Sequence, residues 1–361
     1  MLKTIVTYSL FLLISHSLIA GTINTLTGSV QGTLVLQPSG VKAGNQTRDW
    51  AQVLSVIWQR QMTASSANAI RMRNGEIWYG KVLGIRKNRL KILIEPFGEK
   101  DIDLQLIEMI EFQPGGKAGL EMKPGKLYKK NGHPVTGLLG GINRHRVQVN
   151  TALGKLILKR QEVLAYVCNK PDFEELETDE IGLANKSVFR GKLTLEKDAL
   201  VLEHATLGKA RFATGALAYI RRHQPGIERL KFSAWKLIKR QGPLNRGPLP
   251  KPLTYTAAGL WTQATEITAG TTLRLSKSDS MANAKLSVLV CMTEQSKTAL
   301  VLRASAGGKE ISKKVLKAGS PPHYWSFPVS NADIDITVEY DKLVKVPCTV
   351  VFGDPVIRKN K

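Results

Sequence analysis

The 361-residue chain is poor in cysteine and histidine. Its three cysteines are too few for the disulfide-dense scaffold that small exported domains use. Two of them, Cys291 and Cys348, lie in apolar segments near the C-terminus and are either a bridged pair or two buried thiols. The six histidines are scattered, with no two at metal-ligand spacing, so the sequence predicts no metal site.

Sequence motifs of common enzymes are also absent. The chain contains no GxSxG nucleophile elbow, no HExxH helix, no phosphate-binding loop and no CxxC pair. We predict a protein that is not an enzyme, with no catalytic residues and no cofactor. An unrecognised hydrolase, whose active site is assembled from residues far apart in the sequence, is the alternative.

Long apolar runs are missing except near the N-terminus. There Lys3 precedes the apolar run 10–14, and small residues follow, a pattern typical of a signal peptide over residues 1–20. We predict a secreted or periplasmic protein, with retention of this segment as the alternative. No other run reaches the roughly 20 apolar residues of a membrane-spanning helix, so no transmembrane span is expected in the mature chain.

Acidic residues are scarce, since 29 Asp and Glu oppose 52 Lys and Arg and leave a net charge of +23. Such an excess favours anionic partners, such as an anionic polysaccharide or a membrane surface. Nine basic residues and one acidic residue lie between positions 221 and 251. The candidate polyanion-binding residues in this stretch are Arg221, Arg222, Arg229, Lys231, Lys236, Lys239 and Arg240.

Residues 223–252 are also rich in Pro and Gly, which predicts a basic linker with solvated lysines. Within it, one face of a basic amphipathic helix suited to an anionic surface would carry Ile227, Leu230, Ala234 and Ile238. The alternation of Leu230, Phe232 and Ala234 favours instead a strand that covers a barrel edge.

A second charge cluster has the opposite sign. Six acidic residues crowd the segment from Asp172 to Glu180, without the regular spacing and central glycine of a calcium-binding loop. We predict a solvated acidic linker over residues 169–182.

One short pattern occurs four times in the first 222 residues. Each copy has a tight-turn dipeptide, namely Thr27-Gly28, Asn74-Gly75, Asn131-Gly132 or Asn185-Lys186. Asn-Gly is typical of a type I′ hairpin turn, in which both residues have positive φ. The pattern therefore predicts four β-hairpins.

Three of the copies continue in register beyond the turn. Glycines lie within apolar runs at Gly80, Gly137 and Gly191. A second glycine follows 17 or 18 residues later, at Gly98, Gly154 and Gly208, and an apolar position 12 residues after that, at Ile110, Tyr166 and Ile220. Alternating apolar residues between these marks predict strands.

The copies are 57 residues apart from Gly75 to Gly132, which suits small independent domains better than solenoid repeats. We therefore predict a chain of small five-stranded barrels, the first two packed as one body. The predicted barrels cover residues 22–68 (a degenerate first copy), 69–115, 126–168 and 183–222.

The order of hairpin, curved glycine-containing strand, second turn and closing strand resembles SH3-like and Sm-like small barrels over residues 22–222. Gly80, Gly137 and Gly191 match the first-motif glycine of Sm-like proteins. The basic-glycine pair of their second motif is missing, so the resemblance implies the fold and not an RNA site. Nucleic acid is not an expected partner, whereas the edge strands of small barrels would allow self-association.

After residue 252 the repeat ends. Residues 253–358 contain short alternating segments at intervals of about 8 to 12 residues, as in a β-sandwich or jelly roll. This region resembles the sandwich modules of secreted bacterial proteins, several of which bind carbohydrate. The candidate carbohydrate-binding residues are Trp261, Tyr324 and Trp325, with core packing as their alternative role.

Together these features predict an all-β protein with tandem small barrels followed by a C-terminal β-sandwich. The predicted function is that of an exported, non-enzymatic binding or scaffold protein of the cell envelope, whose basic barrel region binds an anionic polymer or surface. A carbohydrate-binding accessory protein that acts through the sandwich is the alternative.

Overall fold

The computed structural model describes residues 20–25, 28–58, 67–114, 122–172, 178–196, 199–230, 235–240, 251–253, 264–277, 281–292, 298–319, 323–341 and 348–359. The regular structure of these residues consists of strands and three short 3₁₀ turns, without an α-helix, which confirms the all-β prediction. Among them, no helix is long and apolar enough to cross a membrane. Residues 1–19, which carry nearly all of the predicted signal peptide, lie outside the described residues.

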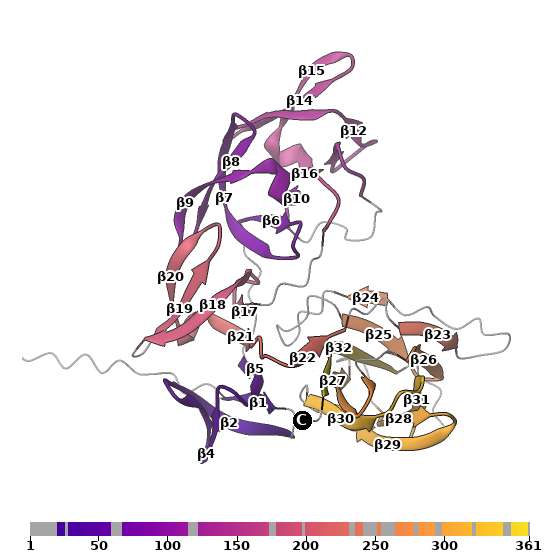
Figure 1. Cartoon of the computed structure of the whole chain (residues 1–361). Helices are drawn as coiled ribbons and strands as arrows, with labels where there is room; N and C mark the ends of the chain where they lie inside the picture. The colour runs from indigo at the N-terminus through magenta and orange to yellow at the C-terminus, as the bar shows by residue number, and fades with distance from the viewer. Residues whose placement is uncertain are drawn as a thin grey trace, which may run out of the picture.

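The copies of the sequence pattern correspond to four groups of strands, here called units 1 to 4 (Figure 1). Unit 1 comprises β1 (Ala20–Thr25), β2 (Gly28–Gln37), β3 (Gly40–Ala43), β4 (Gln46–Asp49) and β5 (Val53–Trp58). Unit 2 comprises β6 (Asn68–Met72), β7 (Ile77–Arg86), β8 (Arg89–Ile94), β9 (Gly98–Asp103), the 3₁₀ turn η1 (Leu104–Leu106) and β10 (Ile107–Glu111).

Unit 3 comprises β11 (Lys126–Lys129), β12 (Val135–Thr136), β13 (Leu138–Ile142), β14 (Arg146–Thr151), β15 (Gly154–Lys159), the 3₁₀ turn η2 (Arg160–Glu162) and β16 (Val163–Val167). Unit 4 comprises β17 (Asp179–Leu183), β18 (Val188–Glu196), β19 (Ala199–His204), β20 (Gly208–Ala213), the 3₁₀ turn η3 (Thr214–Ala216) and β21 (Leu217–Arg221). In every unit the last strand returns antiparallel beside the first. The likeness of the units to SH3-like and Sm-like barrels stays a prediction.

The repeated glycines have a steric reason. A Cβ atom at Gly80, Gly137 or Gly191 would lie 2.5, 2.5 or 2.3 Å from a backbone carbonyl oxygen of the neighbouring strand. The second set, Gly98, Gly154 and Gly208, has φ of 79°, 119° and 84°, a conformation that disfavours residues with a side chain. The first glycine of each copy therefore allows two strands to approach closely, and the second glycine provides a turn residue with positive φ.

The turn type differs from the type I′ prediction. In three of the dipeptides only the second residue has positive φ, namely Gly75 (87°), Gly132 (88°) and Lys186 (73°). The N–H of Gly75 bonds to the carbonyl of Met72, which closes a three-residue loop: a type I turn followed by one left-handed residue. A turn with positive φ at both central residues occurs instead between β7 and β8, at Lys87 and Asn88.

The units pair through their closing strands. In units 2 and 3, β10 runs antiparallel to β16 with Ile110 opposite Tyr166. In units 1 and 4, β5 runs antiparallel to β21 with Val56 opposite Ile220. Two of the apolar positions marked by the repeat, Ile110 and Tyr166, thus meet each other, and the third, Ile220, meets Val56 of unit 1. The expectation that the first two units pack as one body is wrong. The closing strand of unit 1 pairs with unit 4, and the closing strand of unit 2 pairs with unit 3.

A third junction joins units 2 and 4. Ile77 of β7 lies opposite Val188 of β18, one residue pair at equivalent positions of the two units. On either side of it, the N–H of Tyr79 donates to Oγ of Ser187 (3.1 Å) and the N–H of Arg190 donates to Oε1 of Glu76. The matching bonds give this junction an approximate two-fold symmetry.

The predicted acidic linker 169–182 needs correction at its end. Asp179 and Glu180 begin β17 and are buried, with 8% and 0% of their surface exposed. Glu180 pairs with Arg190 (2.7 Å) and Asp179 pairs with Arg222 (3.0 Å), so arginines from unit 4 compensate the buried carboxylates. Residues 173–177 lie outside the described residues.

The C-terminal part is a β-sandwich, in agreement with the sequence. Its strands are β22 (Ile227–Arg229), β23 (Trp235–Lys239), β24 (Lys251–Leu253), β25 (Ala264–Thr268), β26 (Thr271–Leu275), β27 (Ala284–Met292), β28 (Leu300–Ala306), β29 (Lys309–Leu316), β30 (His323–Val329), β31 (Ile334–Tyr340) and β32 (Thr349–Lys359). One sheet has the order β24-β25-β32-β27-β30 and the other β23-β26-β31-β28-β29, with the apolar core between them.

The predicted linker 223–252 contributes three strands to this sandwich. Within it, β22 pairs with β32, β23 with β26 and β24 with β25. Trp235 packs into the core, which gives the segment a reason to adopt strand structure. The helical interpretation is therefore wrong. The strand interpretation stays a prediction, because Leu230 lies just after β22 and residues 231–234 lie outside the described residues. The neighbouring strands β22 and β23 extend the sheets of the sandwich and not a barrel edge.

One outer face of the sandwich packs against units 1 and 4. Leu54 and Tyr219 of the closing strands meet Leu289, Tyr324 and Val351 there in one buried apolar cluster. Units 1 and 4 and the sandwich thus share an apolar interface.

The two C-terminal cysteines lie on opposite faces of the same sheet. Cys291 belongs to the interface cluster and Cys348 to the sandwich core. Both are buried, and this arrangement does not suit a disulfide between them.

Candidate anion-binding site

Several of the arginines predicted to bind a polyanion are occupied by contacts within the chain. Arg221 lies 3.3 Å from Glu180, and Arg222 lies 3.0 Å from Asp179 and above the ring of Trp50. Their side chains are only 17% and 23% exposed. The high local density of positive charge therefore serves to neutralise buried carboxylates.

The remaining predicted residues, as far as the structure describes them, do not gather into one site. Arg229 donates to the carbonyl of Arg222 (3.0 Å). Lys236 and Lys239 are exposed and Arg240 is half-buried on or beside β23, which Figure 1 shows on the side of the sandwich away from β21. Lys231 lies outside the described residues.

Two of the three candidate carbohydrate-binding aromatics, Trp325 and Tyr324, are buried. Trp325 is 4% exposed, donates from Nε1 to Oγ of Ser312 (2.9 Å) and lies 4.6 Å from the ring of Phe327. Tyr324 is 6% exposed in the interface with units 1 and 4. These positions match the alternative role of core packing, and no ring face is presented to a sugar. Trp261 lies outside the described residues.

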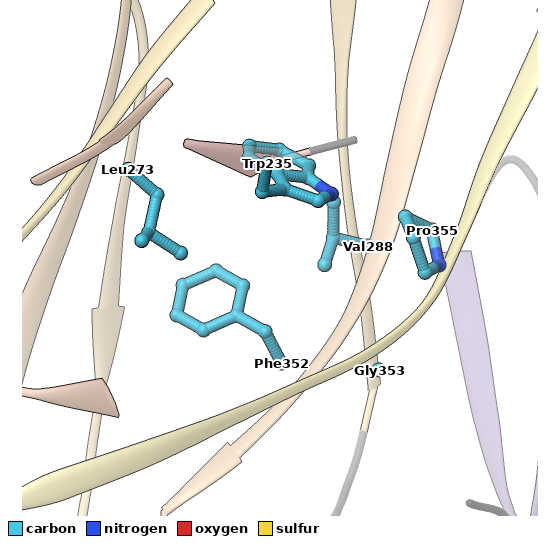
Figure 2. Close-up of a pocket in the computed structure, with 6 residues that line it drawn as sticks. All are labelled: Trp235, Leu273, Val288, Phe352, Gly353 and Pro355. Atoms are coloured by element: carbon cyan, nitrogen blue, oxygen red, sulfur yellow. The ribbon is translucent and has the colours of Figure 1, made fainter. Parts of the chain in front are cut away.

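A gap in the sandwich core does not offer a ligand site either. Figure 2 shows its apolar lining, with Trp235 on one side and Phe352 on the other. The gap is too small to admit a water molecule, so it is a packing defect between the two sheets.

A basic recess on unit 3 has the features that the predicted site lacks. It has a volume of about 580 Å³. It is lined by Phe112, Gln113, Arg144, His145, Arg146, Lys159, Arg160 and Gln161, a set with four Lys or Arg side chains and no carboxylate. We call it the basic recess.

Local hydrogen bonds shape the rim of the basic recess. In the turn between β13 and β14, Oδ1 of Asn143 accepts from the N–H groups of His145 (2.9 Å) and Arg146 (2.8 Å). The N–H of Arg160 in turn donates to the carbonyl of His145 (2.8 Å), which ties the turn to η2. These bonds hold the Arg144–Arg146 segment beside the end of β15.

Arg160 is a half-buried part of the lining of the basic recess. Its Nη1 donates to the carbonyls of Val82 and Asn143 (both 3.1 Å) and its Nη2 to Oδ1 of Asn68 (2.5 Å). The guanidinium also lies 5.4 Å from the centre of the Phe112 ring. Because all these partners are uncharged, nothing offsets the desolvation that lowers the pKa of Arg160. An anion in the recess would supply the missing charge.

The cations of the rim are exposed. Arg144, Arg146 and Lys159 are open to solvent and form no ion pair with any residue that the structure describes. They contrast with Arg221 and Arg222, whose charge is already paired. The rim therefore holds positive charge available to a ligand.

A sequence signal for this site existed in the charge of each unit. Residues 126–168 contain eight Lys or Arg and one Glu, whereas residues 69–115 contain eight Lys or Arg and seven Asp or Glu. Unit 3 contains no dense run of positive charge, because its basic residues are spread along several strands. Its excess of positive charge becomes visible when the net charge of each unit is counted separately.

The comparisons with known proteins assign neither a family nor a ligand. No protein-family model and no curated protein matches the chain. Three solved structures similar to the chain have TM-scores of 0.30, 0.24 and 0.25, below the level that supports a shared fold.

One of these structures contains the carbohydrate-binding module CBM51-2, in complex with GlcNAc, and INT domains from Clostridium perfringens ZmpB (TM-score 0.30, 7% identity, 59% of this chain and 43% of that chain). Another is of the carbohydrate-binding modules of the β-sandwich superfamily (0.24, 7%, 66% and 98%). A third is SGBP-B from a xyloglucan utilization locus of Bacteroides uniformis (0.25, 9%, 83% and 99%). This chain thus spans less than half of the length of the first.

Proposed function

We propose that the chain is an exported, non-enzymatic binding protein of the cell envelope that engages an anionic polymer through the basic recess of unit 3. The observation that carries the proposal is a lining with four Lys or Arg side chains and no carboxylate. Export is proposed from the N-terminal sequence, which has the pattern of a signal peptide.

The recess supplies two kinds of positive group. Arg160 is fixed by three hydrogen bonds to Val82, Asn143 and Asn68, which leaves two of its five N–H donors for a ligand. Carboxylate, sulfate and phosphate groups accept such paired donors well. The exposed cations of the rim then attract the neighbouring charges of the same polymer.

The shape of the recess favours a polymer over a small enclosed ligand. Its rim residues Arg144, Arg146 and Lys159 are exposed, so a long chain can enter and leave across the surface. The recess also lies between β10 and the β13–β15 sheet, on strands that belong to the joined units 2 and 3. It is thus built on paired strands, which keep its charges in place.

The test is a calorimetric titration of the full chain with alginate, a soluble polyuronate, at increasing salt. Binding through released counterions predicts that affinity falls steeply as salt rises. Replacement of Arg144, Arg146 and Lys159 by Ala is expected to weaken binding at least tenfold and to flatten the salt dependence.

The matched control removes the same amount of charge elsewhere. Lys236, Lys239 and Lys313 are exposed on the sandwich, and their joint replacement by Ala is expected to change affinity by less than about twofold. Equal losses in both triple variants, or binding that does not respond to salt, would overturn the proposal.

A further inference from the structure

Unit 3 also exposes apolar side chains. Leu153, Leu138 and Ile157 are 101%, 73% and 53% exposed, more than any other large apolar residue that the structure describes. All three belong to the sheet β13-β14-β15 or its turn. Exposed aliphatic residues are common singly, but a group of this kind marks an interaction site.

The three residues lie on the projecting part of unit 3. Figure 1 shows the β14–β15 hairpin extending away from the other strands, with Leu153 in its turn. Leu138 is opposite Asn150 and Ile157 is opposite Gln148, so both occupy the outer face, while Val147 and Val149 face the core.

Equivalent positions in units 2 and 4 are covered. Leu153, Phe97 and Leu207 each precede the second glycine of the repeat. Phe97 packs 5.1 Å from the ring of Phe189 at the junction of units 2 and 4, and Leu207 is 1% exposed there. The hairpin of unit 3 has the same apolar tip without a covering unit. Something outside the described residues of the chain is thus expected to cover it.

Charge decides what kind of partner fits. Lys155 lies on the same outer face as Ile157, and Arg146 and Lys159 lie at the base of the hairpin. With eight basic residues and one acidic residue in unit 3, a second copy docked there through the same unit would be repelled. An anionic partner is required.

We propose that the β14–β15 hairpin docks on an anionic lipid surface, with Leu153, Leu138 and Ile157 entering the interface and the surrounding cations contacting headgroups. The proposal rests on the proposed function, because it uses the cations of the basic recess. A convex hairpin tip cannot bury the roughly 800 Å² per partner of a stable protein interface. A lipid interface needs no shape complementarity, and a mixed apolar and cationic surface suits it.

The experiment is flotation of the full chain with vesicles of phosphatidylglycerol and phosphatidylcholine, against vesicles of phosphatidylcholine alone. The wild type is expected to bind the anionic vesicles only. The double variant Leu153→Ser and Ile157→Ser should bind them about tenfold more weakly, since both side chains are exposed and the fold does not depend on them. The control Leu106→Ser, at a site 46% exposed on unit 2, should bind as the wild type does.

A second variant reports insertion directly. Tryptophan at the tip, Leu153→Trp, is expected to show fluorescence at shorter wavelength when anionic vesicles are added. An unshifted spectrum together with unchanged binding of the double variant overturns the lipid proposal. A dimer that the double variant dissolves also overturns it, in favour of a second copy as the partner.

The lipid proposal and the proposed function fail in different ways. The double variant should keep the wild-type affinity for soluble alginate, because the basic recess is intact. The triple Ala variant at Arg144, Arg146 and Lys159 should lose affinity for both alginate and anionic vesicles. Loss of vesicle binding alone in the triple variant would reject the polymer proposal and leave the lipid surface as the ligand.

Discussion

The imidazole Nε2 of His204 lies 3.0 Å from Oε1 of Glu76, although the two residues are 128 positions apart and belong to different units. Nδ1 of His204 accepts hydrogen bonds from the N–H groups of Thr206 and Leu207, both at 3.0 Å. Because Nδ1 is an acceptor, the ring is neutral and its proton lies on Nε2, which donates to the Glu76 carboxylate. Both side chains are buried, so this bond fixes the junction of units 2 and 4.

Replacing His204 by Ala is expected to destabilise this junction by about 3 kcal/mol, because it leaves a buried carboxylate and two backbone N–H groups without these partners. Native-state hydrogen exchange checks this: amides of β7 and β19 should exchange faster, while those of β27 in the sandwich stay unchanged. The control is His223→Ala, since His223 uses its backbone N–H to bond Asp179. Equal exchange in both variants would contradict the role of the pair.

Acid is expected to weaken unit 4 through Glu180. Burial alone would raise the pKa of this carboxyl group, but the charges of Arg221 and Arg190 and the hydrogen bonds from Arg190 and Tyr219 outweigh it and lower the pKa below 4.5. The stabilisation is thus present above pH 4.5 and is lost as pH falls through the lowered pKa.

The variant Glu180→Gln tests the sign of this effect. Its thermal midpoint should lie below that of the wild type at neutral pH, and the difference should shrink as pH falls below 4.5. The measurement is a series of thermal unfolding curves from neutral to acidic pH. A difference that grows on acidification would show that the carboxylate is not stabilised in the folded chain.

Cys168 is expected to resist thiol reagents in the folded protein. Burial raises the pKa of its thiol to about 12, so the reactive thiolate is scarce at mildly alkaline pH. Reaction with a chromogenic disulfide reagent at pH of about 8 should be slow in buffer and fast in guanidinium. Comparison with Cys168→Ser isolates the signal of this residue, and fast reaction of the native wild-type thiol would contradict the assignment.

Gly191 is expected to tolerate no side chain. A Cβ atom there would lie 2.3 Å from the carbonyl oxygen of Glu203, so Gly191→Ala must separate β18 from β19 and should cost about 1 to 3 kcal/mol. The matched control is Gly215→Ala, where a Cβ atom meets nothing within 4 Å. Urea unfolding should show a lower midpoint for the first variant only. A similar midpoint for both would mean that the strands move apart at little cost.

Sequence reasoning located the repeat because its marks are set by local backbone needs. Gly98 and Gly208 take positive φ, and Gly191 allows close strand approach, whatever the rest of the chain does. Ile110 and Tyr166 are both apolar marks of the repeat, yet the sequence did not predict that they pair with each other, because strand pairing between units depends on edges that lie far apart in the sequence.

The candidate sites were harder to predict for the same reason. Arg221 stands in the densest run of positive charge, but the buried Glu180 folds back onto it from another strand. Trp325 has the side chain of a sugar-binding residue, but its position in the register of β30 turns it into the core. The residues next to Arg160 in the sequence do not indicate a binding site. The β13–β14 turn, the end of β15 and Phe112, which line the recess with Arg160, come together only in the folded chain.

Neighbouring residues and composition alone specify most strands, the turns that need glycine and the excess of positive charge. Which of these charges remain available to a ligand depends on contacts between residues that are distant in the sequence. A buried carboxylate such as that of Glu180 must be paired with a positive charge, and the guanidinium groups of Arg190 and Arg221 fill this role. Their charge is therefore not available to a ligand. Arg144 and Arg146 kept their charge exposed because no described carboxylate reaches them.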